Sequence, residues 1–342
     1  MAAAFIVAGL AAAGCGSSSN PSSGSTGAAG GATGTTAAAS TQRTAFRAPH
    51  DLAAAEHPVL ADFPAADGRS LTQLGALAPT RVSLGPTTGT FTPGTRRYAF
   101  ALTTTSTGGW VYAPTAVYIA TSLHSPAQGP YPAPADPMTV APQYRSQQNS
   151  GPFGLKAIYA AQVQLARAGV YYVLALTRSG TRLISAIGEL PVAASSRIPD
   201  VGQRPPDIST ETPASVHGDL ALMTTRLPPE HMNSVSFNQV LGKRPIALLF
   251  STPQLCTSRV CGPVTDVTVE LQHRFGRQIT FIHQEIYVDN NPSKGIRPQM
   301  RAFHLETEPW LFTINSRGII TARLEGAFGT HELTQALEAA LQ

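Results

Sequence analysis

The sequence predicts an all-β sandwich followed by an α/β domain, and three observations indicate this fold class. Between about Arg81 and Ala193, short segments of alternating apolar and polar residues are separated by Gly- and Pro-containing turns. Such alternation is typical of antiparallel sheets with one solvated face. After residue 206 the apolar runs become continuous, as in strands covered on both faces, and segments with helical spacing lie between them. A length of 342 residues also leaves room for two domains.

The amino terminus carries a short apolar run, MAAAFIVAGLAAAG, which ends in small residues and is followed by Cys15. This arrangement resembles a bacterial lipoprotein signal peptide, in which the cysteine receives a diacylglycerol. Ala13, Gly14 and Cys15 match that motif, whereas Ala12 replaces the usual Leu and no basic residue precedes the run. The resemblance implies a signal peptide over residues 1–15, a lipid anchor on Cys15, and a location on the extracytoplasmic face of the cell membrane. An ordinary cleaved signal peptide with an incidental cysteine is the alternative.

The segment after Cys15 lacks the residues of a folded core. From Gly16 to Ser40 every residue is Ala, Gly, Ser, Thr, Asn or Pro. Residues 16–45 are therefore expected to form a disordered stalk that tethers the rest of the chain. The sequence has no run of about 20 apolar residues, which excludes a multi-span membrane protein.

Basic residues do not gather into a footprint for nucleic acid. Residues 1–197 contain 12 Lys and Arg against 6 Asp and Glu, whereas residues 198–342 contain 12 against 14. The positive balance therefore belongs to the first half. That half has no run of more than two basic residues, and a phosphate-binding surface requires clustered Lys and Arg. The sequence therefore predicts no nucleic-acid partner. The positive balance of the first half is expected instead to cause a mild attraction to an anionic lipid surface.

Residues 46–196 are expected to form the sandwich. An amphipathic piece with Leu71, Leu74 and Leu77 precedes the strands and is expected to pack onto them. The segment ARAGVYYVLALTRSG resembles the late hairpin of immunoglobulin-like domains, which implies an immunoglobulin-like sandwich. Residues 124–152, rich in Pro, Gly and Gln, are interpreted as a long surface loop. The predicted strands are 96–105, 115–123, 157–165, 169–177 and 182–192.

Residues 197–342 are expected to form the α/β domain, with residues 197–206 as a linker. Val264, Val267 and Leu271 recur at helical spacing, and Pro263 suits the first turn of a helix. The predicted order is strand, helix, strand, strand, strand, helix, which describes the thioredoxin fold. The predicted elements are strand 246–251, helix 263–275, strand 279–288, strands 310–314 and 319–325, and helix 331–341.

Three sequence blocks, FSTPQLCTSRVCGP, FIHQEIYVDN and EPWLFTINSRG, follow one another in this domain. Together they resemble actinobacterial envelope lipoproteins of the thioredoxin family. Residues 198–342 as a whole resemble exported thioredoxin-like proteins related to TlpA and the peroxiredoxins. The resemblance implies thiol–disulfide exchange with exported proteins and no cofactor.

Cys256 and Cys261 lie between the strand 246–251 and the following helix, where that family has its redox pair. Once Cys15 carries lipid, they remain as a pair that can be oxidised outside the cytosol. Four residues separate them, instead of the two that are usual in the family. Counting from the end of the strand aligns Cys256 with the family nucleophile, whereas matching Cys-Gly-Pro aligns Cys261 with it.

We favour Cys261 as the thiolate, because unpaired N–H groups at a helix start lower the pKa of a thiol. Cys256 would then resolve the mixed disulfide with substrate. A structural disulfide without turnover is the alternative.

Pro309 precedes a strand, in the position of the family's cis-proline, which faces the disulfide. The resemblance therefore implies that Pro309 is the third residue of the site. Glu308 stands where the family has Thr, Val or Ile. A carboxylate beside the thiols would disfavour the thiolate. The alternative is that Glu308 points to solvent.

A non-catalytic binding module that handles copper or zinc is the other class of function. Two thiols and a histidine suit Cu(I) or Zn(II), and Cys256, Cys261 and His304 are the candidate ligands. In the thioredoxin-fold proteins that deliver copper, the two cysteines are closer together in the sequence than Cys256 and Cys261 are here. His283 alternates with polar residues along a predicted strand, where a hydrogen-bonded structural histidine is expected.

Overall fold

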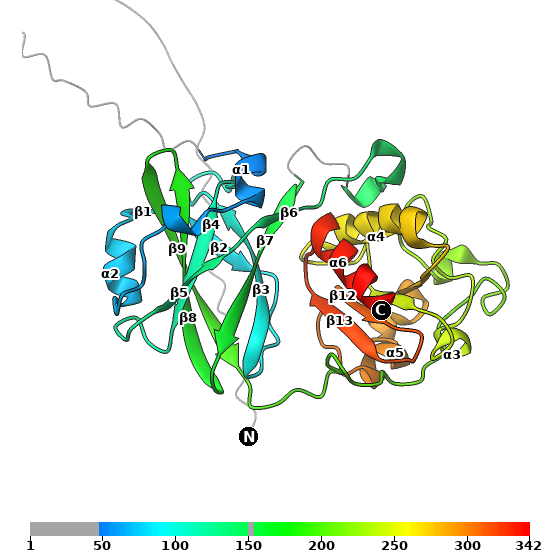
Figure 1. Ribbon diagram of the computed structural model, residues 1–342. Coiled ribbons are helices and arrows are strands. Elements are labelled where there is room, and N and C mark those ends of the chain that lie inside the picture. Colours follow the sequence, from blue (N-terminus) through cyan, green and yellow to red (C-terminus); the bar gives the residue numbers. More distant parts are fainter. Residues whose placement is uncertain (1–47, 150–153) are drawn as a thin grey trace, which may run out of the picture. The chain divides into compact units, whose positions relative to one another are not determined.

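The computed structural model describes residues 48–149 and 154–342 (Figure 1). The predicted signal peptide, the predicted lipid attachment at Cys15 and the predicted stalk lie outside these residues. The described residues belong to one compact unit. Within this part of the chain, no helix combines the length and the apolar character that a membrane crossing requires.

Two β-sheets make up the first half of the described chain (Figure 1). One has the strand order β1-β9-β8-β4-β5 and the other the order β2-β3-β7-β6. All neighbours are antiparallel except β1 and β9, which are parallel. The strands are β1 (Thr80–Arg81), β2 (Ser83–Pro86), β3 (Gly94–Thr103), β4 (Thr115–Ala120), β5 (Gln128–Pro132), β6 (Ala135–Pro137), β7 (Ala157–Leu165), β8 (Gly169–Ser179) and β9 (Arg182–Val192).

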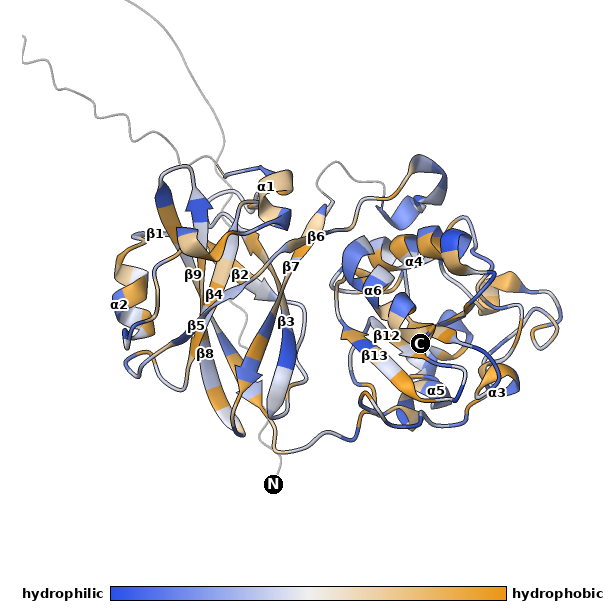
Figure 2. Ribbon diagram, in the orientation of Figure 1, coloured by the Kyte–Doolittle hydropathy of each residue, from blue (hydrophilic) through white to orange (hydrophobic). Residues whose placement is uncertain are grey.

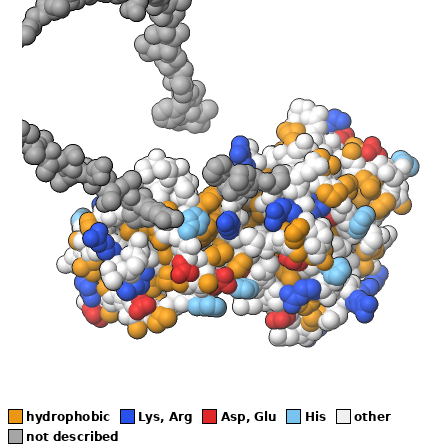
Figure 3. All heavy atoms as spheres, turned by 90° about the horizontal axis from the view of Figure 1, so that it is seen from above, with side chains coloured by type: hydrophobic (Ala, Val, Ile, Leu, Met, Phe, Trp, Pro, Cys, Tyr) orange, Lys and Arg blue, Asp and Glu red, His pale blue; other side chains and the backbone are white. Residues whose placement is uncertain are grey.

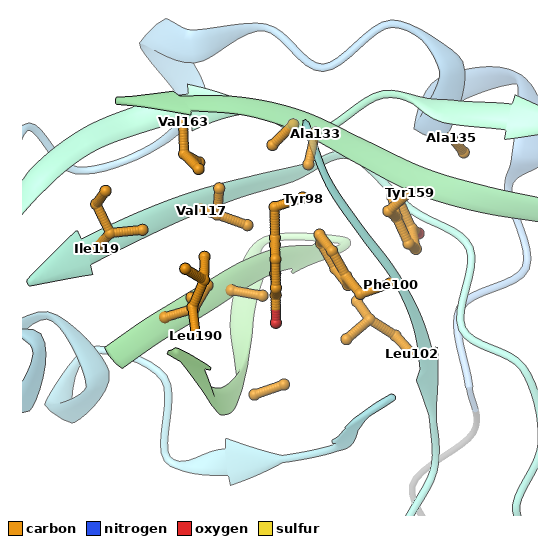
Figure 4. Close-up of a cluster of buried hydrophobic side chains, with 14 of the residues drawn as sticks. Tyr98, Phe100, Leu102, Val117, Ile119, Ala133, Ala135, Tyr159, Val163 and Leu190 are labelled. Carbon is orange, nitrogen blue, oxygen red and sulfur yellow. The ribbon is translucent and has the colours of Figure 1, made fainter. Parts of the chain in front are cut away.

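The two sheets enclose a common core, and side-chain alternation along the strands decides which residues enter it. Tyr98 and Phe100 of β3 point into this core together with Tyr159 of β7 (Figure 4). Phe100 and Tyr159 stack with ring centroids 5.4 Å apart. A hydrophilic stretch is followed by a hydrophobic one along β3, and β8 has a hydrophobic middle (Figure 2). Residues 173–177 of β8 are all buried, because Val173 and Ala175 face this core whereas Leu174 and Leu176 are covered on the other face.

Short helices accompany these sheets, and α2 packs on the outer face of the five-stranded sheet over β4 and β8. Ser70 and Gln73 form a capping box at the start of α2 (Leu71–Ala76), where each side chain accepts the backbone N–H of the other residue. Leu71 and Leu74 are buried against the five-stranded sheet, as predicted, whereas Leu77 is 50% exposed. The other short helices are α1 (Leu52–Glu56), η1 (Leu60–Asp62), η2 (Pro142–Tyr144) and η3 (Gln147–Asn149).

The prediction of a surface loop over residues 124–152 is wrong for the described part of that segment. It contains β5 and β6, and Ala135 and Asp136 of β6 are buried. Proline suppressed the strand signal, because it cannot donate to a ladder and normally marks a turn. Both strands lie at the edges of their sheets, which are the places where proline is tolerated.

The second half is a four-stranded mixed sheet with the order β11-β10-β12-β13. β10 runs parallel to β11 and antiparallel to β12, and β13 is antiparallel to β12. This strand order, with α4 joining the two parallel strands, is a thioredoxin-like arrangement. The elements are η4 (Leu220–Leu222), α3 (Phe237–Val240), β10 (Ile246–Phe250), α4 (Cys261–Phe275), β11 (Thr280–Gln284), η5 (Val288–Asn290), η6 (Pro292–Lys294), α5 (Pro298–Ala302), β12 (Trp310–Ile314), β13 (Ile320–Glu325) and α6 (Thr330–Ala340).

Apolar side chains cover both faces of this sheet. One face packs with α4 and α6, and the other with the short helices α3 and α5. Every residue of β10 is buried, as its continuous apolar run predicted. α4 begins at Cys261, two residues before the predicted start, and β11 ends at Gln284, four residues before the predicted end.

Each half has buried clusters of its own, and one further cluster contains residues of both. Ala99 and Ile158, on the outer face of the β3–β7 pair, pack in one cluster with Val264 of α4 and Leu337 of α6. The four-stranded sheet of the first half therefore has apolar neighbours on both faces. The two halves therefore share a core at this cluster.

Buried charges also join the halves at α6. Arg97 of β3 donates to both carboxylate oxygens of Glu332 at 2.6 Å and to the carbonyls of Glu325 and Ala327. Asp136 of β6 accepts hydrogen bonds from three backbone N–H groups at the start of α6, those of Gly329, His331 and Glu332. A carboxylate at this position satisfies donors that have no partner within the helix.

Candidate dithiol site

Cys256 and Cys261 flank the turn that joins β10 to α4. The buried strand β10 ends at Phe250, and α4 starts at Cys261 itself. Both cysteines are free thiols; Cys256 is 8% exposed and Cys261 is fully buried. Pro263 lies in the first turn of α4, where its missing N–H costs no helical hydrogen bond. The sequence therefore places both sulfur atoms at a helix N-terminus, as predicted.

Hydrogen bonds to its sulfur lower the pKa of the Cys256 thiol to about 5. The largest contribution is the hydrogen bond from the Cys261 side chain; Ser258 also bonds the sulfur, with its Oγ 3.2 Å from Sγ. The backbone N–H groups of Cys261 and Val260 donate to it as well, against the opposing effect of burial. These N–H groups belong to the open end of α4, which stabilises a thiolate.

The pKa of Cys261 moves in the opposite direction. Burial raises it well above its usual value, and so do the hydrogen bond to Cys256 and the negative charges of Cys256 and Glu308. Only the backbone N–H of Thr252 opposes this rise. These directions favour Cys256 as the thiolate, whereas the sequence favoured Cys261, and the choice of nucleophile stays a prediction. Unpaired N–H groups point out of the helix towards the preceding loop, so they reach Cys256 rather than the residue that begins the helix.

The Glu308–Pro309 peptide bond is cis, and Pro309 is buried at the start of β12. The register pairs Trp310 with Phe250, so the turn that contains Pro309 lies beside the one that carries the cysteines. Glu308 is half-buried, and burial together with the charge of Cys256 raises its pKa to about 7. Its carboxyl group thus lies near the thiols, which agrees with the expectation of a carboxylate beside them and argues against the solvent-facing alternative.

A buried ion pair lies beneath this site. His283 and Glu230 are fully buried, and His283 Nδ1 lies 2.7 Å from Glu230 Oε1. Burial alone would lower the pKa of His283, but the Glu230 carboxylate raises it. For Glu230, burial acts to raise the pKa and His283 lowers it below its usual value. The other ring nitrogen of His283 bonds to the Ser251 carbonyl, so His283 is the structural histidine that the sequence predicted.

A second buried carboxyl, Glu285, follows β11. Its Oε1 accepts the N–H and the hydroxyl of Thr225 at 2.6 and 2.7 Å. Burial raises its pKa, and the hydrogen bonds from Thr225 oppose that rise. The sequence did not predict this buried carboxyl, because a lone Glu after a strand carries no pattern.

The candidate metal ligands do not assemble. Within the described ranges, no three His, Cys, Asp or Glu side chains lie close enough together to hold a metal ion. His304 is exposed and lines a cavity of about 660 Å³ together with Arg301 and Glu306. The three-ligand site of Cys256, Cys261 and His304 is therefore not formed.

Comparisons with known proteins add one structural likeness. No protein-family model matches the chain, and no curated protein matches it. Among solved structures, it is similar to a candidate thiol:disulfide interchange protein, DsbE, from Chlorobium tepidum. The two share 15% sequence identity with a TM-score of 0.28, and the match covers 42% of this chain and 99% of the other.

Proposed function

We propose that this protein is a thiol–disulfide oxidoreductase in which Cys256 is the nucleophile and Cys261 the resolving thiol. The observation that carries the proposal is the opposite shift of the two thiol pKa values within one hydrogen-bonded pair at a helix N-terminus. A thiol with a pKa of about 5 is a thiolate at neutral pH, which is the form that attacks a disulfide. A neighbouring thiol that keeps its proton is the group that acts second.

The exchange runs in two balanced steps. The Cys256 thiolate attacks one sulfur of a partner's disulfide, forming a mixed disulfide and releasing the partner's other sulfur as a thiolate that takes up a proton. Cys261 then loses its proton, attacks Cys256 Sγ, and releases the first partner sulfur as a thiol. The partner gains two electrons and the Cys256–Cys261 pair is oxidised. The reverse sequence oxidises a dithiol partner.

Glu308 is the proposed proton acceptor for Cys261. Its pKa of about 7 allows it to take a proton at neutral pH and to return it in the reverse reaction. Its negative charge also raises the pKa of Cys261, which supports a position near that thiol. The departure from the family residue before Pro309 thus supplies an acid–base group.

The remaining parts of the proposal concern placement in the cell. Residues 1–15 are a lipoprotein signal peptide, Cys15 carries the lipid, and residues 16–45 are the stalk. Residues 46–196 form an immunoglobulin-like sandwich and residues 197–342 the thioredoxin-like domain. The partners are exported proteins with thiols or disulfides, at the extracytoplasmic face of the membrane. Cys15→Ala is expected to abolish lipid labelling of the protein.

Trapping the mixed disulfide tests the proposal. Mixed with insulin as the disulfide substrate, Cys261→Ser is expected to accumulate a covalent adduct, because the Ser hydroxyl still donates to Cys256 but cannot resolve the bond. Cys256→Ser is expected to form none. Non-reducing electrophoresis separates the species. An adduct that forms mainly through Cys261 would reverse the assignment, and the absence of any adduct with either variant would indicate a structural pair.

A further inference from the structure

The dithiol helix is held by a segment of the first half of the chain. Asp266 lies five positions after Cys261 in α4 and is fully buried. Its carboxylate accepts hydrogen bonds from the Ser146 backbone and hydroxyl at 2.9 and 3.0 Å and from Asn149 Nδ2 at 3.1 Å. It also accepts Arg226 Nε at 3.0 Å. A buried carboxylate with so many donors fixes the position of the helix that carries it.

Arg226 ties two segments together at the same point. It is 3% exposed and donates to the Tyr144 carbonyl at 2.7 Å and to the Pro228 carbonyl at 2.5 Å, as well as to Asp266. A planar guanidinium group makes such divergent bonds in one rigid geometry, which a lysine does not reproduce. Residues 144–149 and 224–228, here called the clamp, are therefore both joined to α4 at the Asp266 carboxylate.

Gln148 brings the clamp against the residue that follows Cys261. Its side chain donates to the Thr225 carbonyl and accepts the Leu227 N–H, both at 3.1 Å. It packs against Gly262, the residue after Cys261. A Cβ placed on Gly262 would lie 3.1 Å from Gln148 Cβ and 3.3 Å from its carbonyl oxygen. A side chain on residue 262 would therefore push Gln148 away by a few tenths of an ångström.

The clamp also reaches the loop that carries Cys256. The hydroxyl oxygen of Thr225 accepts the N–H of Gln254, two residues before Cys256, at 3.1 Å. The same hydroxyl donates to the buried Glu285. Gln148 of the first half therefore contacts Gly262 at one end of the Cys256–Cys261 loop. Through its hydrogen bond to Thr225 it is also connected to Gln254, near the other end.

We propose that the clamp is part of the redox site, and that Gln148 and Arg226 are positioning residues that hold the Cys256 loop against the N-terminus of α4. The inference rests on the proposed function. Residues 144–149 belong to the first half of the described chain and residues 224–228 to the second. The proposal therefore makes thiol exchange a property of both halves. The distance from Cys256 Sγ to the N–H groups of Val260 and Cys261 is what the clamp controls.

The test measures the pH midpoint of Cys256 alkylation in the full-length chain with Cys261→Ser. We expect Gln148→Ala to raise this midpoint by about one pH unit, which is about a tenfold loss of thiolate below the midpoint. Gly262→Ala is expected to raise it similarly, although alanine favours a helix over glycine and so leaves α4 itself intact. Arg226→Lys, which keeps the charge but loses the fork, is expected to shift it in the same direction.

Ser185→Ala is the matched control. Ser185 is buried in β9, and its hydroxyl donates to the Ala78 carbonyl at 2.8 Å, away from the clamp. It is expected to lower the melting temperature without moving the midpoint. If the alkylation midpoint of Cys256 lies near pH 5 and Gln148→Ala and Gly262→Ala leave it unchanged, the role of the clamp is refuted and the proposed function stands. A midpoint near 9 before any clamp substitution would overturn the proposed function and the inference with it.

Discussion

At the scale of single residues, the chemistry of the site depends on which thiol receives the hydrogen bonds. Cys256 accepts them from Ser258, Val260 and Cys261, whereas burial raises the pKa of the Cys261 thiol. Residue type and spacing identified the pair but could not assign the roles. The assignment depends on the path of the four intervening residues, which the spacing does not specify.

Glu308 gives the first prediction at this scale. Replacing it with Gln removes the proton acceptor, so resolution of the mixed disulfide is expected to slow about tenfold or more. The inflection near pH 7 in the wild-type rate is expected to disappear, because it belongs to the Glu308 carboxyl. Stopped-flow measurement of adduct decay against pH checks both effects. Glu306→Gln, an exposed neighbour, serves as the control. Faster decay above pH 7 in Glu308→Gln would indicate a purely repulsive charge instead.

The hydrogen bond between the two thiols gives the second prediction. Cys261→Ala deletes the largest single contribution to the low pKa of Cys256. The alkylation midpoint of Cys256 is therefore expected to rise by about one pH unit or more relative to Cys261→Ser, which retains a donor. Equal midpoints in the two variants would show that the helix N-terminus alone is responsible.

At the scale of elements, hydrophobic periodicity predicted most of the fold. The bounds of β7, β9 and β12 agree with the predicted strands, because alternating or continuous apolar runs end at clear breaks. Periodicity failed at β5 and β6, where proline masks edge strands, and at α3 and α5, which are only four and five residues long. Hydrophobic periodicity could not predict the clamp, because Ser146, Arg226 and Asp266 are far apart in the sequence and form no repeat.

The start of α6 gives a prediction about pH and stability. Burial, followed by the charge of Glu332, raises the pKa of Asp136 to about 6. The folded chain therefore favours the protonated Asp136 carboxyl. The stabilisation that this protonated group contributes is fully present below about pH 4 and is lost as the pH rises through 6. The shift corresponds to about 3 kcal/mol. The amide in the Asp136→Asn variant cannot ionise, so the free energy of unfolding of wild type minus that of this variant is expected to fall between pH 4 and pH 7.

Denaturation by urea at several pH values measures this difference. The comparison of the two proteins cancels the titration of the other buried carboxyl groups, which shift in the same direction at Asp266, Glu285 and Glu325. A difference that stays constant with pH would show that the three backbone N–H groups keep Asp136 ionised without cost.

At the scale of the whole molecule, the two halves are joined by apolar packing and by buried charges at α6 and at the clamp. Basic side chains are scattered among other types on the face drawn in Figure 3, without a single large patch. The sequence predicted two parts with a linker over residues 197–206, and this boundary stays a prediction. Periodicity could not predict that β3 and β7 pack against α4 and α6, because that contact depends on how the complete halves dock.

Docking of the halves predicts cooperative unfolding. Arg97 is half-buried and bonded to Glu332 and two carbonyls, so Arg97→Ala leaves these partners unpaired and is expected to cost about 2–3 kcal/mol. Calorimetry is expected to show one transition for the whole chain, shifted to lower temperature by this substitution. Arg178→Ala removes a single hydrogen bond on the exposed surface and is expected to have little effect. Two transitions, with only one shifted, would show that the halves unfold independently.

The reduction potential of the Cys256–Cys261 couple tests the central claim most directly. An acidic Cys256 stabilises the reduced pair, which makes the disulfide easier to reduce. Equilibration with glutathione buffers, followed by quenching and mass analysis, is therefore expected to give a potential between about −120 and −270 mV, the range of exchanging thiol proteins. A potential below about −300 mV, typical of a structural disulfide, would contradict thiol–disulfide exchange as the function of this site.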